Sequence, residues 1–127
     1  MKERGTAAAG GGTDCPIVAV VGTEVSTTKE LLDTIAAQLR FPSYFGHNWD
    51  ALDECLQDLS WLPERVIAIR HEGIPPIAAD ELLTYLSILA DAAERWNADA
   101  THELDVGFPS PEWAVVERLT RGRLRGA

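Results

Sequence analysis

The chain lacks several features that would assign it to a common functional class. Its two cysteines, Cys15 and Cys55, form no CxxC pair and no disulfide framework, which indicates a reducing compartment. Gly22-Thr23-Glu24-Val25, after the first predicted strand, matches neither G-x-G-x-x-G nor the P-loop pattern, so nucleotide binding is disfavoured. No apolar run approaches the roughly 20 residues that span a bilayer, and no signal-peptide core is present. We therefore expect a cytoplasmic protein without membrane contact.

Basic residues are also scarce through most of the chain. The formal net charge is -9, and residues 41–117 hold 15 acidic but only 3 basic side chains, whereas four arginines lie close to the C-terminus. An acidic body repels the phosphates of nucleic acid and of anionic lipid, so we expect no direct nucleic-acid binding. It favours a basic protein partner and steered association. The alternative is that the acidity serves only solubility.

The spacing of apolar residues predicts an α/β fold. Residues 17–21, 65–70 and 104–108 are expected to form strands, and helical patterns fill the intervals between them. The run 17–21 is continuously apolar, which is typical of a strand buried on both faces. Strands separated by helices imply a parallel sheet with right-handed crossovers. We therefore predict a three-stranded parallel sheet packed by helices.

One domain with two flanking segments is expected. Residues 1–14 are rich in alanine and glycine and are predicted to be a disordered tail, followed by a domain over residues 15–109. Ser110-Pro111-Glu112 predicts a helix start with proline at the first helical position. Residues 110–127 would then be a C-terminal helical extension whose arginine-rich end frays. We expect a monomer.

Capping residues mark where the other helices begin. Thr27 and Glu30 have the spacing of a capping box, and Asn48 is a strong N-cap. Asp80 is the predicted cap of a long helix that follows the second strand.

The helix that opens on Asn48 carries carboxylates close together. Asp50 and Glu54 are four residues apart and share a face, with Asp53 beside them. Like charges at this spacing cost a helix about 0.2–0.5 kcal/mol per pair. Cys55 falls on the opposite, apolar face and is expected to be a small buried side chain. A ridge that weakens its own helix indicates a use outside it, either against a basic partner or as a catalytic pair.

Other functions for these carboxylates remain open at this point. Asp50 and Glu54 could divide acid and base roles if their environments separated their pKa values. His47 together with these two acids offers ligand types suited to zinc, although the spacing fits no zinc motif. Asp50 also suits the positive end of the helix dipole. Because the acids lie on a helix predicted to face solvent, we expect no enzymatic activity, no cofactor and no bound metal.

Residues 41–56 closely resemble the barstar family of ribonuclease inhibitors. The shared pattern is an aromatic pair, glycine, a variable residue, Asn, an apolar residue, Asp-Ala-Leu, an acidic position, Cys and Leu. The element order from residue 17 to 108 also fits. The resemblance implies a three-stranded parallel sheet with helices. It further implies a cytoplasmic inhibitor that plugs the active site of a secreted ribonuclease with its acidic helix and preceding loop.

The resemblance also implies contact residues. Glu54 matches a carboxylate that stands where an RNA phosphate would bind, Asp50 a second acidic position, and Tyr44 an aromatic that packs on the enzyme. Asp91, on the long helix, aligns with a further acidic contact. The expected partner-binding residues are Tyr44, Phe45, Gly46, His47, Asn48, Trp49, Asp50, Asp53, Glu54 and Asp91.

This chain departs from the family pattern at several of these positions. Glu54 stands where barstar has an aspartate, and Asp53 where it has a tryptophan. Phe45, His47 and Trp49 replace a tyrosine, a glutamate and a leucine. The acidic helix itself is retained, so we expect the partner to be a basic, barnase-like ribonuclease or a related toxin. The alternative is a barstar-like interaction module, or an immunity protein for another toxin, without ribonuclease inhibition.

Overall fold

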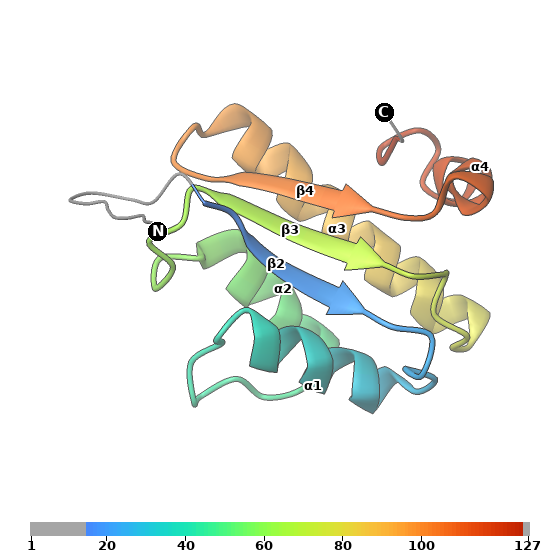
Figure 1. The fold of residues 1–127 in the computed structure, drawn as a ribbon, viewed down its shortest axis with the longest axis horizontal. Coiled ribbons are helices and arrows are strands. Elements are labelled where there is room, and N and C mark those ends of the chain that lie inside the picture. The colour runs from blue at the N-terminus through green and yellow to red at the C-terminus, as the bar shows by residue number, and fades with distance from the viewer. Residues whose placement is uncertain (1–14, 126–127) are drawn as a thin grey trace.

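The computed structural model describes residues 15–125 and shows three parallel strands with helices packed against them (Figure 1). The strand order is β2-β3-β4, and both pairings are parallel. The predicted α/β fold is confirmed, while the predicted disordered tail, residues 1–14, lies outside the described residues. In chain order the elements are β2 (Ile17–Val21), α1 (Thr28–Gln38), α2 (Trp49–Asp58), β3 (Val66–His71), α3 (Ala79–Ala98), β4 (Glu103–Gly107) and α4 (Ser110–Leu119).

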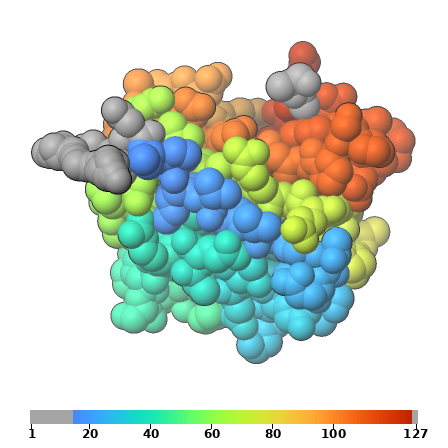
Figure 2. Space-filling model, in the orientation of Figure 1, coloured from blue at the N-terminus to red at the C-terminus, as the bar shows by residue number. Residues whose placement is uncertain are grey.

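One face of the sheet carries the core and the other is open. Crossovers between parallel strands are right-handed, and two that step in the same direction leave their helices on the same face. In β2, Ala19 and Val21 are buried on the helix side, whereas Val18 and Val20 are 38% and 42% exposed. No helix crosses in front of the strands in Figure 1, and atoms of β2 and β3 reach the surface in Figure 2. The expectation that this strand is buried on both faces is therefore wrong.

The outer edge of β2 is capped at Val20 by a side chain. Gln38, the last residue of α1, donates its Nε2 to the carbonyl of Val20 at 2.8 Å and accepts the Val20 N–H at 2.7 Å. The amide thus makes the two hydrogen bonds that another strand would make. This protects the edge from pairing with a second chain.

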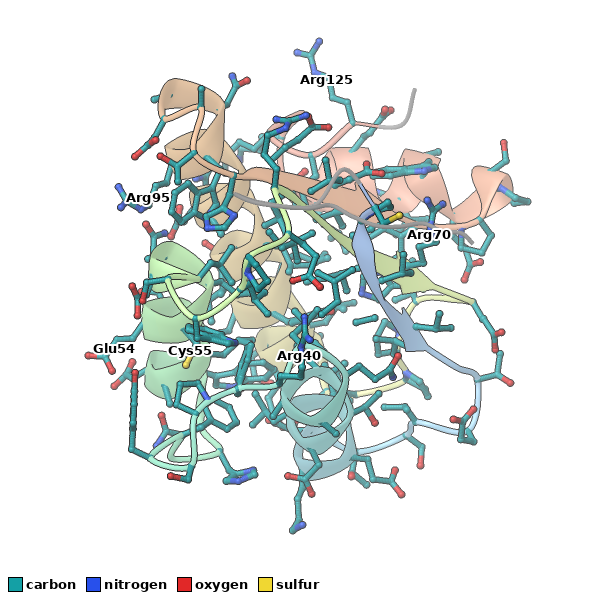
Figure 3. The ribbon with its side chains drawn as sticks, turned by 60° about the vertical axis from the view of Figure 1, so that its left-hand side comes forward. Arg40, Glu54, Cys55, Arg70, Arg95 and Arg125 are labelled. Atoms are coloured by element: carbon teal, nitrogen blue, oxygen red, sulfur yellow. The ribbon has the colours of Figure 1, made fainter. Side chains whose placement is uncertain are left out.

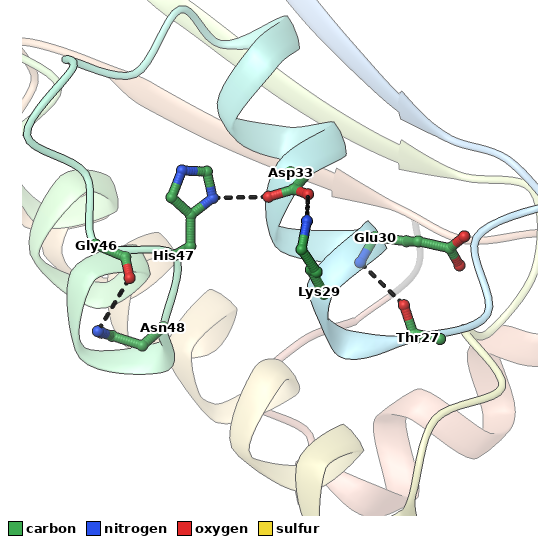
Figure 4. A network of polar contacts seen from close by, with 7 residues as sticks. All are labelled: Thr27, Lys29, Glu30, Asp33, Gly46, His47 and Asn48. Carbon is green, nitrogen blue, oxygen red and sulfur yellow. Dashed lines mark hydrogen bonds and ion pairs between the residues drawn. The ribbon is translucent and has the colours of Figure 1, made fainter.

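The predicted helix starts are confirmed for α1 but not for α3. The hydroxyl of Thr27 accepts the N–H of Glu30 at 3.1 Å (Figure 4). The Glu30 carboxylate accepts the N–H of Ser26 at 2.9 Å. The N-cap of α3 is Ala78, which has no side chain to cap with. Asp80 instead lies in the first turn, where the helix dipole favours its charge. Its prediction as the cap is therefore wrong.

A buried polar network lies at the carboxyl end of β3. The carbonyl of Gly107 can only accept, so His71 donates its Nδ1–H to it at 2.8 Å, and His71 Nε2 accepts the Tyr85 hydroxyl at 2.6 Å. The ring of Phe108 stacks on His71 with centroids 4.0 Å apart. Burial lowers the pKa of His71 to about 4, partly opposed by its hydrogen bond to Gly107, so the imidazole is neutral at pH 7.

The C-terminal extension is folded against α3. α4 begins at Ser110, so the predicted helix is present, but Pro111 is its second residue and not its first, and Val116 is fully buried. Beyond the helix, the hydroxyl of Thr120 donates to the carbonyl of Val116 at 2.8 Å, and Leu124 is 5% exposed. The expectation that the arginine-rich end frays is therefore wrong for residues 121–125. None of the described helices has the length and apolar character needed to cross a membrane.

Candidate protein-binding surface on α2 and the preceding loop

Helix α2 begins where Asn48 supplies the missing backbone partner. The Asn48 Oδ1 accepts the N–H of Ala51 at 2.8 Å, and its backbone is extended. The same side chain donates Nδ2 to the carbonyl of Gly46 at 3.3 Å (Figure 4). One side chain therefore joins the loop to the first turn of the helix and sets the direction in which the helix leaves the loop.

Gly46 leaves room for the capping side chain and is not needed for a left-handed backbone. Among the described glycines only Gly122 has a positive φ. A Cβ at Gly46 would lie 3.2 Å from Nδ2 of Asn48. A larger residue would therefore push against the capping side chain.

His47 fastens the loop to α1. Its φ is +53°, in the left-handed region that histidine enters more readily than most residues. His47 Nδ1 lies 2.7 Å from Asp33 Oδ1, and Lys29 Nζ lies 2.7 Å from Asp33 Oδ2 (Figure 4). The Lys29 ammonium, with a smaller contribution from His47, lowers the pKa of Asp33.

The histidine is thus engaged with α1 and not with the acids of α2. The trio of His47, Asp50 and Glu54 that could have bound zinc is not assembled. Within residues 15–125, no group of three or more His, Cys, Asp or Glu side chains is arranged to hold a metal ion.

The aromatic residues of the surface divide into anchors and an exposed ring. Phe45 is buried and packs edge-to-face on Phe41, with centroids 4.9 Å apart. Trp49 is half-buried, and its ring lies 6.0 Å from that of Tyr85 on α3. Tyr44 is 76% exposed. Of these aromatics, Tyr44 therefore offers most of its ring to another molecule.

Asp50 and Glu54 point outward from α2. Both are exposed, and Figure 3 shows Glu54 directed away from the body of the molecule, whereas Cys55 lies on the inner side of the helix. In the part of the chain that the structure describes, neither carboxylate makes a hydrogen bond or an ion pair. The outer face of α2 is therefore an acidic surface without an internal counter-ion.

A groove of about 500 Å³ lies beside Glu54. Cys55 is buried there as predicted, and burial, followed by the charges of Asp58 and Glu54, raises the pKa of its thiol. The thiol is therefore protonated at neutral pH and offers a small apolar contact. The groove is lined by Tyr44, Phe45, Ala51, Asp53, Glu54, Cys55, Gln57 and Asp58.

Asp53 lines this groove and also has a carboxylate oxygen without a partner in the described part of the chain. The residue is half-buried, and its Oδ1 is buried without a hydrogen-bond partner among the described residues. A buried carboxylate oxygen without a donor is unfavourable in free energy. A donor supplied by a bound molecule would relieve this cost.

Asp91 is separate from the other predicted contact residues. It lies on α3, and its Oδ1 is 2.5 Å from Nη2 of Arg123, which also contacts Glu94 at 2.9 Å. The structure thus gathers the remaining predicted residues on α2 and its loop and places Asp91 in an intramolecular ion pair. The sequence analysis did not predict the ion pairs of Arg123 with α3. The cluster of arginines near the C-terminus was the signal that could have indicated them.

The sequence matches the family model Barstar (barnase inhibitor) over residues 15–108, about three quarters of the chain. The matched range contains the whole sheet, α1, α2, α3 and all the predicted contact residues, and it ends before α4. A search of curated proteins gives no match.

Proposed function

The chain belongs to the barstar family, and on that premise we propose that it inhibits a basic ribonuclease by covering the active site with α2 and the preceding loop. The proposal rests on the exposure of Asp50 and Glu54 and on their lack of a counter-ion within the described residues. They project from a capped helix, and no described residue neutralises them. Such a surface is complementary to a cationic site.

A ribonuclease active site must be cationic, because it holds RNA phosphates and stabilises the charge that develops during phosphoryl transfer. The field of α2 would attract such a site over a distance of about 10 Å at 0.1 M salt, which raises the association rate. Close pairs with arginine or lysine then slow dissociation. Removing one partner of a buried, hydrogen-bonded charge pair costs about 2–5 kcal/mol.

The groove explains how a cationic side chain would be received. Glu54 and Asp53 both line it, and the Oδ1 of Asp53 is buried without a hydrogen-bond partner among the described residues. Tyr44 stands at the same groove with an exposed ring, and tyrosine is a frequent anchor residue in protein interfaces. An arginine of the partner would therefore meet both carboxylate and aromatic contacts.

An inhibitor of this kind needs no catalytic residue of its own, and we propose that the chain is not an enzyme. Asp50 and Glu54 are both exposed on the outer face of α2. Without burial of one carboxyl group, nothing sets the two environments apart for acid and base roles.

We also propose that the protein acts as a monomer in the cytoplasm.

The test is a titration of the purified protein against a panel of basic microbial ribonucleases, followed by RNA cleavage at low and moderate salt. We expect stoichiometric, salt-sensitive inhibition that is lost in Glu54→Gln. Asp105→Asn is the matched control, because Asp105 is an exposed acid on the open face of the sheet. If the folded protein inhibits no member of the panel, the proposal of ribonuclease inhibition is wrong.

A second candidate is an immunity or interaction protein for a toxin of another class. It is favoured by Asp53, whose partly buried carboxylate occupies a position that is aromatic in the family pattern. A partner that places an additional cation there would differ from a barnase-like enzyme. Capture of a non-nuclease protein by the wild type, but not by Glu54→Gln, would support this candidate.

A further inference from the structure

The C-terminal segment brings a cation onto the acidic surface of α3. Nη2 of Arg123 lies 2.5 Å from Oδ1 of Asp91 and 2.9 Å from Oε1 of Glu94, and Nε lies 2.9 Å from Oε2 of Glu94. The two bonds to Glu94 use the planar fork of the guanidinium, the strongest geometry for such a pair. The Arg123 contact lowers the pKa of Glu94. We call these three residues the Arg123 clamp.

A folded turn presents Arg123 to α3. Gly122 has a φ of +79°, and its N–H donates to the carbonyl of Glu117 at 2.7 Å, which closes α4. The N–H of Leu124 donates to the hydroxyl of Thr120 at 3.2 Å, and the Leu124 side chain is buried. Arg123 therefore stands between two anchored residues.

Of the Arg123 clamp, Asp91 lies one helical turn from a contact between α2 and α3. Arg95, one turn after Asp91 on the same side of α3, donates its Nε to the carbonyl of Gln57 on α2 at 2.7 Å. Figure 3 shows Arg95 and Glu54 projecting on the same side of the molecule. Without Arg123, Asp91 and Glu94 would be unpaired carboxylates on α3, with Asp91 one turn from the Arg95 contact to α2.

We infer that Arg123 is an internal counter-ion that confines the partner-binding surface to α2 and its loop. The inference rests on the proposed function for the nature of the partner, which is a basic protein surface. Asp91 and Glu94 contribute to binding only when Arg123 is removed. The C-terminal extension, which lies outside the residues matched to the family, thereby determines specificity: it disfavours partners whose cations must contact α3.

The first test uses a hexa-arginine peptide as the cationic probe and follows backbone amide shifts by NMR. In the wild type we expect saturable shifts over residues 44–58 and none at Asp91 or Glu94. In Arg123→Gln the shifts should spread to both, and affinity at low salt should rise about two- to fivefold, the scale of an exposed ion pair. Arg118→Gln removes an equal charge from α4 and should behave as the wild type.

Arg123→Lys is the control for the possibility that Arg123→Gln acts by detaching the C-terminal segment from α3. It keeps the positive charge and loses the fork, so it should leave the wild-type shift pattern in place. Shifts at Asp91 and Glu94 in the wild-type protein, or an Arg123→Gln pattern identical to the wild type, would overturn the inference.

The second test is a double-mutant cycle with a ribonuclease that the wild type inhibits. Asp91→Asn should leave inhibition unchanged when Arg123 is present and should reverse the gain when Arg123 is replaced by Gln. If Asp91→Asn alone weakens inhibition as much as Glu54→Gln does, the inference fails while the proposed function stands. If no ribonuclease is inhibited, the proposed function fails, and the peptide titration still decides the role of Arg123.

Discussion

Helices α2 and α3 both carry acidic side chains, but their carboxylates are in different electrostatic states. On α2, Asp50 and Glu54 are exposed and make no ion pair within the described residues. On α3, Asp91 and Glu94 share the guanidinium of Arg123. The number of acids on a helix therefore overstates its negative surface where another part of the chain supplies a cation. The functional surface is better identified from carboxylates that lack an internal partner.

The largest predicted effect is a loss of folding stability at acidic pH caused by His71. The two helices can be compared only at pH values where the protein stays folded. The pKa of buried His71 is lowered to about 4 from its usual 6.5, so the unfolded state binds more protons between these values. The contribution of His71 to the free energy of unfolding is fully present above pH 6.5, and the free energy should fall by about 3 kcal/mol as the pH drops to 4. Chemical denaturation at several pH values measures this loss.

The control for this prediction is His71→Gln, whose amide can still donate to Gly107 and accept from Tyr85 but cannot titrate. The carboxylates contribute equally to both proteins. If the wild type and His71→Gln lose the same stability on acidification, His71 is not the cause.

The next effect separates binding from stability on α2. Asp50→Asn and Glu54→Gln should each weaken binding to the partner by more than about 2 kcal/mol, because each removes a charge from the contact. Both residues are exposed, so the free energy of unfolding should change by no more than about 0.5 kcal/mol. Calorimetric titration and thermal unfolding measure the two quantities. A variant that mainly lowers the melting temperature would mark its residue as structural.

A smaller effect concerns the start of α2. Asn48→Ala removes the acceptor for the Ala51 N–H and should destabilise the protein by about 1 kcal/mol. Asn48→Asp retains an oxygen at that place and should keep the stability of the wild type. Urea denaturation of the three proteins measures the difference, and an equal loss in both variants would show that the cap is unimportant.

The smallest effect concerns the Arg123 clamp. Its groups are solvent-accessible, so Arg123→Gln should change the unfolding equilibrium constant by less than about fivefold, and salt should remove the difference. Thermal unfolding of both proteins without salt and with about 0.5 M salt, which screens exposed charges, measures this difference. A large, salt-independent loss would show that Arg123 has a packing role instead.

Much of the candidate surface could be predicted because its parts are neighbours in the chain. The Asn48 cap, the outward direction of Glu54 and the burial of Cys55 follow from helical spacing. The burial of Phe45 and the contact of His47 with Asp33 could not be predicted, because they depend on how α1 lies against the loop. That the surface binds a ribonuclease remains a prediction.

By itself, the sequence determined the order of the elements, the parallel sheet and the helix starts after Thr27 and Asn48. The helix caps depend on groups within three residues of each other, which the chain always brings close. Only the tertiary structure decided which face of the sheet stays open, that His71 meets Tyr85, and that Arg123 neutralises α3. These features join groups far apart in the sequence, and Asp91 and Arg123 differ by 32 in residue number. The charge of a surface depends on distances in space, which only the packing of the elements sets.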